Sequence, residues 1–222
     1  ALCLVGSEMC IRDRFIQSLV NNKSLNVNTH MTDSDGVPLY IACANNSLNT
    51  VVILLSMPSV NLNAVNSQGK TPLYAACANG NKKIVDLLLD NNSININKAT
   101  SDNDQTPLYV ACTGGHVEVV NALLKHNSID INIATSDNGQ TPLYVACKGG
   151  HVDVVNTLLK HDSIDINKAT SDNGQTPLYV ACVGGHIEIV NILLKHDSID
   201  INKATSDNSQ TPLYVACVGG HI

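Results

Sequence analysis

The sequence predicts an all-α solenoid, in which short helix-turn-helix units stack in a row and each unit carries a protruding hairpin or loop. The first observation is repetition: 141–175 keeps 30 of the 35 positions of 106–140, and 176–210 keeps 29 of the positions of 141–175. The second is that each copy holds two short helical patterns separated by glycines. Such units bury their apolar faces by stacking on neighbours, so the array favours binding over catalysis.

The first helix of a unit is predicted to begin at the Thr-Pro pair. Thr106 offers a hydroxyl that can cap free backbone N–H groups, and Pro107 fits the first turn, where no N–H is needed. Gly114 and Gly115 follow about seven residues later and tolerate left-handed backbone angles. We therefore expect a helix of about two turns.

A second helix is predicted from Val117 to Lys125. Its apolar residues leave a polar stripe at three-and-four spacing, which decides against a strand despite the valines. Glu118 falls in the first turn and Lys125 in the last, where each suits the helix dipole. The same pairs of an acid and a base recur in the next copies as Asp153 with Lys160 and Glu188 with Lys195.

A short arm is predicted after the second helix. Ile129 to Asn132 alternate apolar and polar residues, as in an extended segment, and Asp137 to Gly139 supply turn residues. Each unit therefore reads as helix, turn, helix and protruding hairpin or loop.

These residues resemble the ankyrin repeat. The Thr-Pro-Leu core, the Gly115–His116 pair, the leucine pair and a closing Asp-Ile-Asn occur in the family's order, and the likeness covers almost everything from Phe15 onward. Three features depart from the family. Tyr109 and its equivalents stand where histidine is usual, Cys112 and its equivalents replace a small residue, and the unit is slightly longer, with the excess placed in the hairpin around 98–104.

The pattern divides the chain into units. We expect a non-native segment at 1–14, because residues 4–14 resemble a translated sequencing adapter. Helix two and the hairpin of a partial repeat follow at 15–36. Full repeats are expected at 37–70, 71–105, 106–140, 141–175 and 176–210, and a truncated repeat at 211–222.

The array is expected to begin and end within a unit. Capping units with polar outer faces close natural arrays, and neither end shows one. Leu213, Val215 and Ala216 would then expose one side, and both ends should fray.

Six of the eight cysteines occupy one repeat position: Cys43, Cys77, Cys112, Cys147, Cys182 and Cys217. Stacked helices lie about 8 to 10 Å apart, whereas a disulfide needs Cα atoms within roughly 7 Å. We expect reduced, buried thiols and an intracellular, reducing location, the cytoplasm.

Two patterns could suggest reactive or metal chemistry. Cys112 and His116 are four residues apart, but the spacing crosses two glycines and lacks the paired cysteines of structural zinc sites. His116 is instead expected to join turns by hydrogen bonds. Histidines that end helix two, such as His161, are expected to favour the helix dipole, and their Ser and Asp neighbours recur in every unit without a nucleophile elbow. The sequence predicts no catalytic residue, no metal and no cofactor.

The net charge of −6 argues against nucleic acid as a partner. No apolar run approaches the length of about 18 residues that spans a membrane. The sequence also gives no sign of a small-molecule substrate. We expect the partner to be another protein.

Positions that differ among near-identical copies are the candidate contacts, because the resemblance places helix-one ends and hairpin tips along a concave, partner-binding groove. Free drift of solvent-exposed positions after duplication is the competing interpretation. At the end of helix one the candidates are Ala78, Thr113, Lys148, Val183 and Val218. In the hairpin they are Lys98, Ile133, Lys168 and Lys203.

The resemblance implies a protein–protein interaction scaffold or adaptor that binds a partner through its concave face, and not an enzyme. Two alternatives stay open. The array could be the regulatory or targeting part of a larger enzyme, such as a kinase, or of an ion channel. It could also be a structural spacer without a specific ligand.

Overall fold

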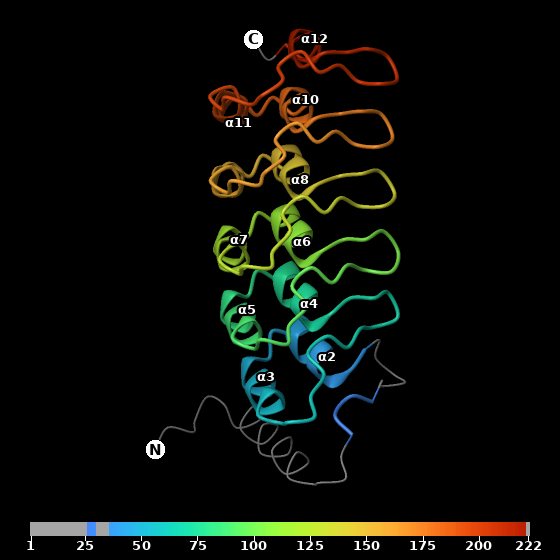
Figure 1. Ribbon diagram of the computed structural model, residues 1–222, viewed down its shortest axis with the longest axis vertical. Coiled ribbons are helices and arrows are strands. Elements are labelled where there is room, and N and C mark those ends of the chain that lie inside the picture. Colours follow the sequence, from blue (N-terminus) through green and yellow to red (C-terminus); the bar gives the residue numbers. More distant parts are fainter. Residues whose placement is uncertain (1–25, 30–35, 221–222) are drawn as a thin grey trace.

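The computed structural model describes residues 26–29 and 36–220, and it confirms the all-α solenoid. Helices alternate between two parallel columns, and a finger projects from every unit on the side away from helix two (Figure 1). The helix-one column holds α2 (Pro38–Ala44), α4 (Pro72–Ala78), α6 (Pro107–Thr113), α8 (Pro142–Lys148), α10 (Pro177–Val183) and α12 (Pro212–Val218). The helix-two column holds α3 (Leu48–Leu55), α5 (Lys82–Leu89), α7 (Val117–Leu124), α9 (Val152–Leu158) and α11 (Ile187–Leu193).

The adapter-like segment 1–14 and most of the partial repeat 15–36 lie outside the described residues. Of that partial repeat, the short stretch 26–29 is described: the Asn28 amide donates to the carbonyl of Ser59 (2.7 Å) and Val27 is buried in the core.

Helix one begins as the Thr-Pro pair predicts. The Thr141 hydroxyl accepts the backbone N–H of Tyr144 (3.2 Å), and Pro142 occupies the first helical position. The same cap is present at Thr71, Thr106, Thr176 and Thr211. The cap supplies an acceptor for an N–H that the helix itself leaves without a partner.

The two glycines end helix one for two different reasons. Gly149 keeps right-handed angles, but a Cβ there would lie 2.5 Å from Nε2 of His151 in the same unit. Gly150 has a φ of +71°, and a Cβ there would also meet the ring of His186 from the following unit at 2.8 Å. The glycine pair therefore makes room for two stacked imidazoles and supplies the left-handed turn.

Helix two ends slightly earlier than the sequence predicts. Leu124 is the last residue of α7 and Lys125 caps it, while Lys160 and Lys195 lie two residues beyond the ends of α9 and α11. The prediction that these lysines lie within the last turn was therefore wrong. Each helix already ends within the leucine pair that precedes the lysine. The acids Glu118, Asp153 and Glu188 do lie in first turns.

One continuous core runs along the array between the two helix columns. In the 141–175 unit it contains Leu143, Cys147, Val155, Leu158 and Ile166, all almost completely buried. The equivalents in neighbouring units join the same cluster, so each unit buries its apolar residues against the next.

The last described unit shows the effect of stacking by contrast. Leu213 is 69% exposed, although its equivalent Leu178 is buried, while Val215 and Ala216 are half-buried against the core. Helix one alone therefore does not enclose its leucine, whereas α10 is packed by both α11 and α12.

The fingers are loops without paired strands anywhere in residues 36–220. In the four units from 71 to 210 each finger is closed by its own threonine: the N–H of Thr170 donates to the carbonyl of Gln175 (3.0 Å), and its hydroxyl donates to Oδ1 of Asn173 (2.8 Å). In the 37–70 unit Asn66 takes this place, and its N–H donates to the carbonyl of Lys70 (3.0 Å). Successive fingers are also joined, since the N–H of Ser171 donates to the carbonyl of Asn138 in the preceding finger (2.9 Å). The fingers form a row tied by the backbone.

Candidate interaction surface

The candidate residues at the ends of helix one form an exposed row along the stack. Val183 is 51% exposed even though α12 packs against α10, and Val218 is 72% exposed. The other three members of the row, Ala78, Thr113 and Lys148, are exposed as well. This set, from Ala78 to Val218, is called the helix-one row below.

Imidazoles fix the spacing of the helix-one row. Nε2 of His116 bonds the carbonyl of Ala78 in the preceding unit (3.1 Å), and His151 and His186 do the same to Thr113 (3.1 Å) and Lys148 (3.2 Å). The expectation that these histidines join turns is confirmed. Because each ring binds the backbone carbonyl and not the side chain, the varied side chain of each row member stays exposed.

The finger candidates form a separate row. Lys98 and Lys168 are exposed, whereas Ile133 and Lys203 are half-buried. Lys203 Nζ donates to the carbonyl of Asn167 in the preceding unit (3.0 Å), so this lysine also serves stacking. Within residues 36–220 no hydrogen bond or ion pair joins this row to the helix-one row.

An asparagine ladder, which the sequence analysis missed, ties each unit to the next. The side chain of Asn132 donates to the carbonyl of Ser163 (2.7 Å) and accepts the N–H of Asp165 (2.9 Å). Asn167 repeats both bonds to Ser198 and Asp200. Equivalent bonds start from Asn28, Asn63 and Asn97. The sequence did carry a signal for this ladder, because Asn, Ser and Asp recur at fixed positions in successive copies.

Four of the repeated tyrosines, Tyr74, Tyr109, Tyr144 and Tyr179, are buried within the stack, whereas Tyr214 is 52% exposed. Tyr144 is buried and its hydroxyl donates to Oε1 of Gln175 (2.8 Å). Because Gln175 directly precedes Thr176, this bond links helix one to the start of the next unit. Burial, together with the charge of Asp172, raises the pKa of Tyr144 to about 12. The hydrogen bonds usual for a histidine at this position are thus replaced by a tyrosine–glutamine pair.

The repeated cysteines are free thiols, as predicted. Cys43, Cys77, Cys112, Cys147 and Cys182 are buried, and Cys217 is exposed. Burial raises the pKa of Cys43 to about 12 and raises that of Cys112 still further. A buried, protonated thiol is a poor nucleophile and a poor metal ligand.

The Cys112–His116 pair is not assembled into a metal site. The thiol is buried in the core, while the imidazole bonds the carbonyl of Ala78. Across the described ranges, no three His, Cys, Asp or Glu side chains gather as a metal site would require.

The histidines that follow helix two accept hydrogen bonds from the turn after the helix. Nδ1 of His196 accepts the N–H of Ser198 (3.3 Å), and His161 and His126 accept in the same way from Ser163 (3.4 Å) and Ser128 (3.3 Å). The ring proton therefore lies on Nε2 and points away from the bond. These histidines lie two or three residues beyond the ends of α7, α9 and α11, and not at the helix end where the sequence analysis placed them.

No helix among the described residues is long and apolar enough to cross a membrane. The surface charges are mostly solvated, because Lys82–Asp86 is the single ion pair formed within residues 36–220.

Comparison with known families supports the repeat pattern. The family described as "Ankyrin repeats (3 copies)" matches residues 8–100, 92–170 and 163–222. No curated protein matches the chain.

Proposed function

Since the chain belongs to the ankyrin-repeat family, we propose that it is a scaffold or adaptor that binds a partner protein through its concave face. Ankyrin repeats are generally protein–protein interaction modules and are typically not catalytic. The proposal assigns the contact to the helix-one row and to the finger residues Lys98, Ile133, Lys168 and Lys203.

The observation that carries the proposal is the pairing of variation with exposure in the helix-one row. Four units that share most of their sequence place Ala, Thr, Lys and Val at this position, and all four side chains are exposed. Exposed valines beside a lysine suit a partner surface that combines apolar contact with a carboxylate or carbonyl acceptor.

The buried thiols support a reducing, cytoplasmic location, because five free cysteines recur in the core at one repeat position. We also infer that the repeats run as 71–105, 106–140, 141–175 and 176–210, after a first full unit at 37–70 and before a partial unit at 211–222. The helices and asparagine bonds recur with this spacing.

Site-specific photo-crosslinking tests the proposal. A photoreactive phenylalanine analogue replaces Thr113, Lys148 or Val183 in cells, and control chains carry it at Asp130 or Asp165, which are exposed on the arms that follow helix two. We expect one shared partner to be captured from the helix-one row and not from these arms. Capture from the control positions alone would refute the assignment.

A further inference from the structure

A second repeat position varies as much as the helix-one row. Across 71–105, 106–140, 141–175 and 176–210, only two of the 35 positions carry a different residue in all four units. One is the helix-one row. The other lies on helix two and is occupied by Leu87, Ala122, Thr157 and Ile192. These four side chains are half-buried, so each contributes to a partly open surface.

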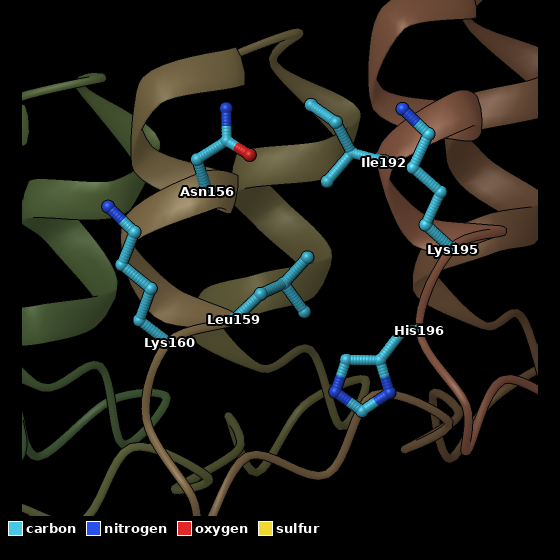
Figure 2. A pocket seen from close by; sticks show the side chains of 6 residues that line it. All are labelled: Asn156, Leu159, Lys160, Ile192, Lys195 and His196. Carbon is cyan, nitrogen blue, oxygen red and sulfur yellow. The ribbon is translucent and has the colours of Figure 1, made fainter.

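This second set lies away from the fingers, because helix two occupies the opposite side of the array (Figure 1). Between α9 and α11, Ile192 of this set lines an open hollow of about 360 Å³. Leu159 and Ile192 lie between Lys160 on one side and Lys195 on the other (Figure 2). Asn156 and His196 complete the lining.

The hollow has an apolar floor and a basic rim. Lys160 and Lys195 are exposed and take part in no ion pair of the described residues, and no carboxylate lines the hollow. His196 adds a donor, because its Nδ1 accepts from Ser198 and leaves Nε2–H as the outward group. Lys125 continues the basic rim into the preceding unit. The charged side chains that line the hollow are therefore all lysines, and the exposed acids Asp162 and Asp197 lie outside its lining.

The spacing of the lysines selects the shape of a ligand. Equivalent positions on stacked helices repeat about every 8 to 10 Å. A helix that lies along the array returns to the same face after seven residues, which is about 10.5 Å. Acidic residues at i and i+7 would therefore meet successive lysines, and apolar residues at i+3 and i+4 would lie over the hollow between them.

We propose that the helix-two side of the array binds an acidic amphipathic helix of a partner protein, with carboxylates on Lys160 and Lys195 and an apolar side chain against Leu159 and Ile192. This surface is separate from the helix-one row. Variation at Leu87, Ala122, Thr157 and Ile192 then sets which apolar side chain fits each unit.

The test uses the full chain and a synthetic helix of about 20 residues, long enough to form turns in water. The probe carries Glu at i, i+7 and i+14, Leu at i+3 and i+4 of each repeat, and Ala or Gln elsewhere. A second probe has Gln in place of Glu. Binding is followed by fluorescence anisotropy at low and at physiological salt.

Two matched pairs of variants locate the binding. The double change Lys160→Glu with Lys195→Glu should lower the affinity for the acidic probe at least tenfold. The double change Lys98→Glu with Lys168→Glu alters the net charge equally, but on the fingers, and should change this affinity less than twofold. Ile192→Ala should lower the affinity for the acidic probe at least threefold, and Val183→Ala should lower it less than twofold. Circular dichroism confirms that each variant is folded.

Three results would overturn the proposal. They are no binding of the acidic probe to the unaltered chain, equal losses in both lysine pairs, or equal binding of the Gln probe. Equal losses would indicate attraction to charge alone, without a located site.

Discussion

The 37–70 and 141–175 units build the same two helices with different local chemistry. Helix one of the first follows Val37, whose side chain makes no cap bond, whereas Thr141 caps α8. The left-handed residue of the turn is Asn46 in the first unit, with a φ of +54°, and Gly150 in the second.

The two units share their buried residues and their asparagine bonds. Leu39 and Leu143 are both fully buried, and so are Cys43 and Cys147. Asn63 binds the following unit as Asn167 does. The comparison teaches that buried apolar residues and the ladder specify stacking, while the threonine cap and the Gly-Gly-His turn add stability to a stack that forms without them.

Alkaline pH should remove the stability of both units together, and this is the largest effect we expect. The folded-state pKa of Cys43 is about 12 against 9.0 for an ordinary thiol, and burial also raises the pKa of Cys147. The folded chain then binds more protons than the unfolded chain above pH 9, so the free energy of unfolding falls as pH rises from about 9 through 12.

Far-ultraviolet circular dichroism in urea, measured from pH 7 to 12, follows this loss. Replacement of Cys43 and Cys147 by Ala removes two of the titrating thiols and should flatten the slope above pH 9. A slope that is unchanged in this variant would show that other groups drive the transition.

Truncation of the shared leucine should affect the two units alike. Leu143→Ala and Leu39→Ala each remove a fully buried side chain, and each should lower the free energy of unfolding by about 2 to 5 kcal/mol. Urea unfolding measures both. A loss below about 1 kcal/mol at Leu39 alone would mean that the first unit does not share the core.

The left-handed position should separate the two units. Gly150→Ala adds a Cβ at positive φ within 2.8 Å of the His186 ring, and should cost about 1 to 3 kcal/mol. Asn46→Gly should change stability by no more than about 0.5 kcal/mol, because asparagine already tolerates this conformation. Thermal unfolding compares the stability of the two variants. Equal effects would contradict the claim that the turn of the 141–175 unit requires glycine.

Exchange of the cap residues should have the smallest effect. Thr141→Val keeps the shape of the side chain but removes the acceptor for Tyr144 N–H, at a cost of about 1 kcal/mol. Val37→Thr should add up to about 1 kcal/mol in the first unit by the same bond. Chemical denaturation measures the free energy of unfolding of both variants. A decrease on Val37→Thr would contradict the stabilising role given to the cap.

Local features of the fold could be predicted from the sequence, and contacts between units only in part. The Thr106 cap and the glycines after Thr113 act within a few residues, so their pattern is visible in one copy. His116 was expected to join turns, but its acceptor, the carbonyl of Ala78, lies 38 residues away and follows from the stacking geometry. The bond partners of Asn132 were missed for the same reason.

The candidate surface was predictable where variation marks exposed positions. Thr113 and Val183 vary and are exposed, as expected for contacts. Ala122 and Ile192 vary equally, but the sequence analysis considered only the ends of helix one and the hairpins and did not single them out. The position of Ile192 beside both Lys160 and Lys195 follows from the stacking of two units and is not visible within one copy.

The most direct test compares partner affinity with stability in two variants, using the partner captured by crosslinking. Thr113→Arg with Val183→Glu should weaken binding at least tenfold, about 1.4 kcal/mol, while the free energy of unfolding stays within about 0.5 kcal/mol. Thr141→Val should do the reverse, lowering stability with affinity unchanged. If the Thr113 and Val183 changes unfold the chain and leave binding intact, the helix-one row belongs to the stack and the partner binds elsewhere.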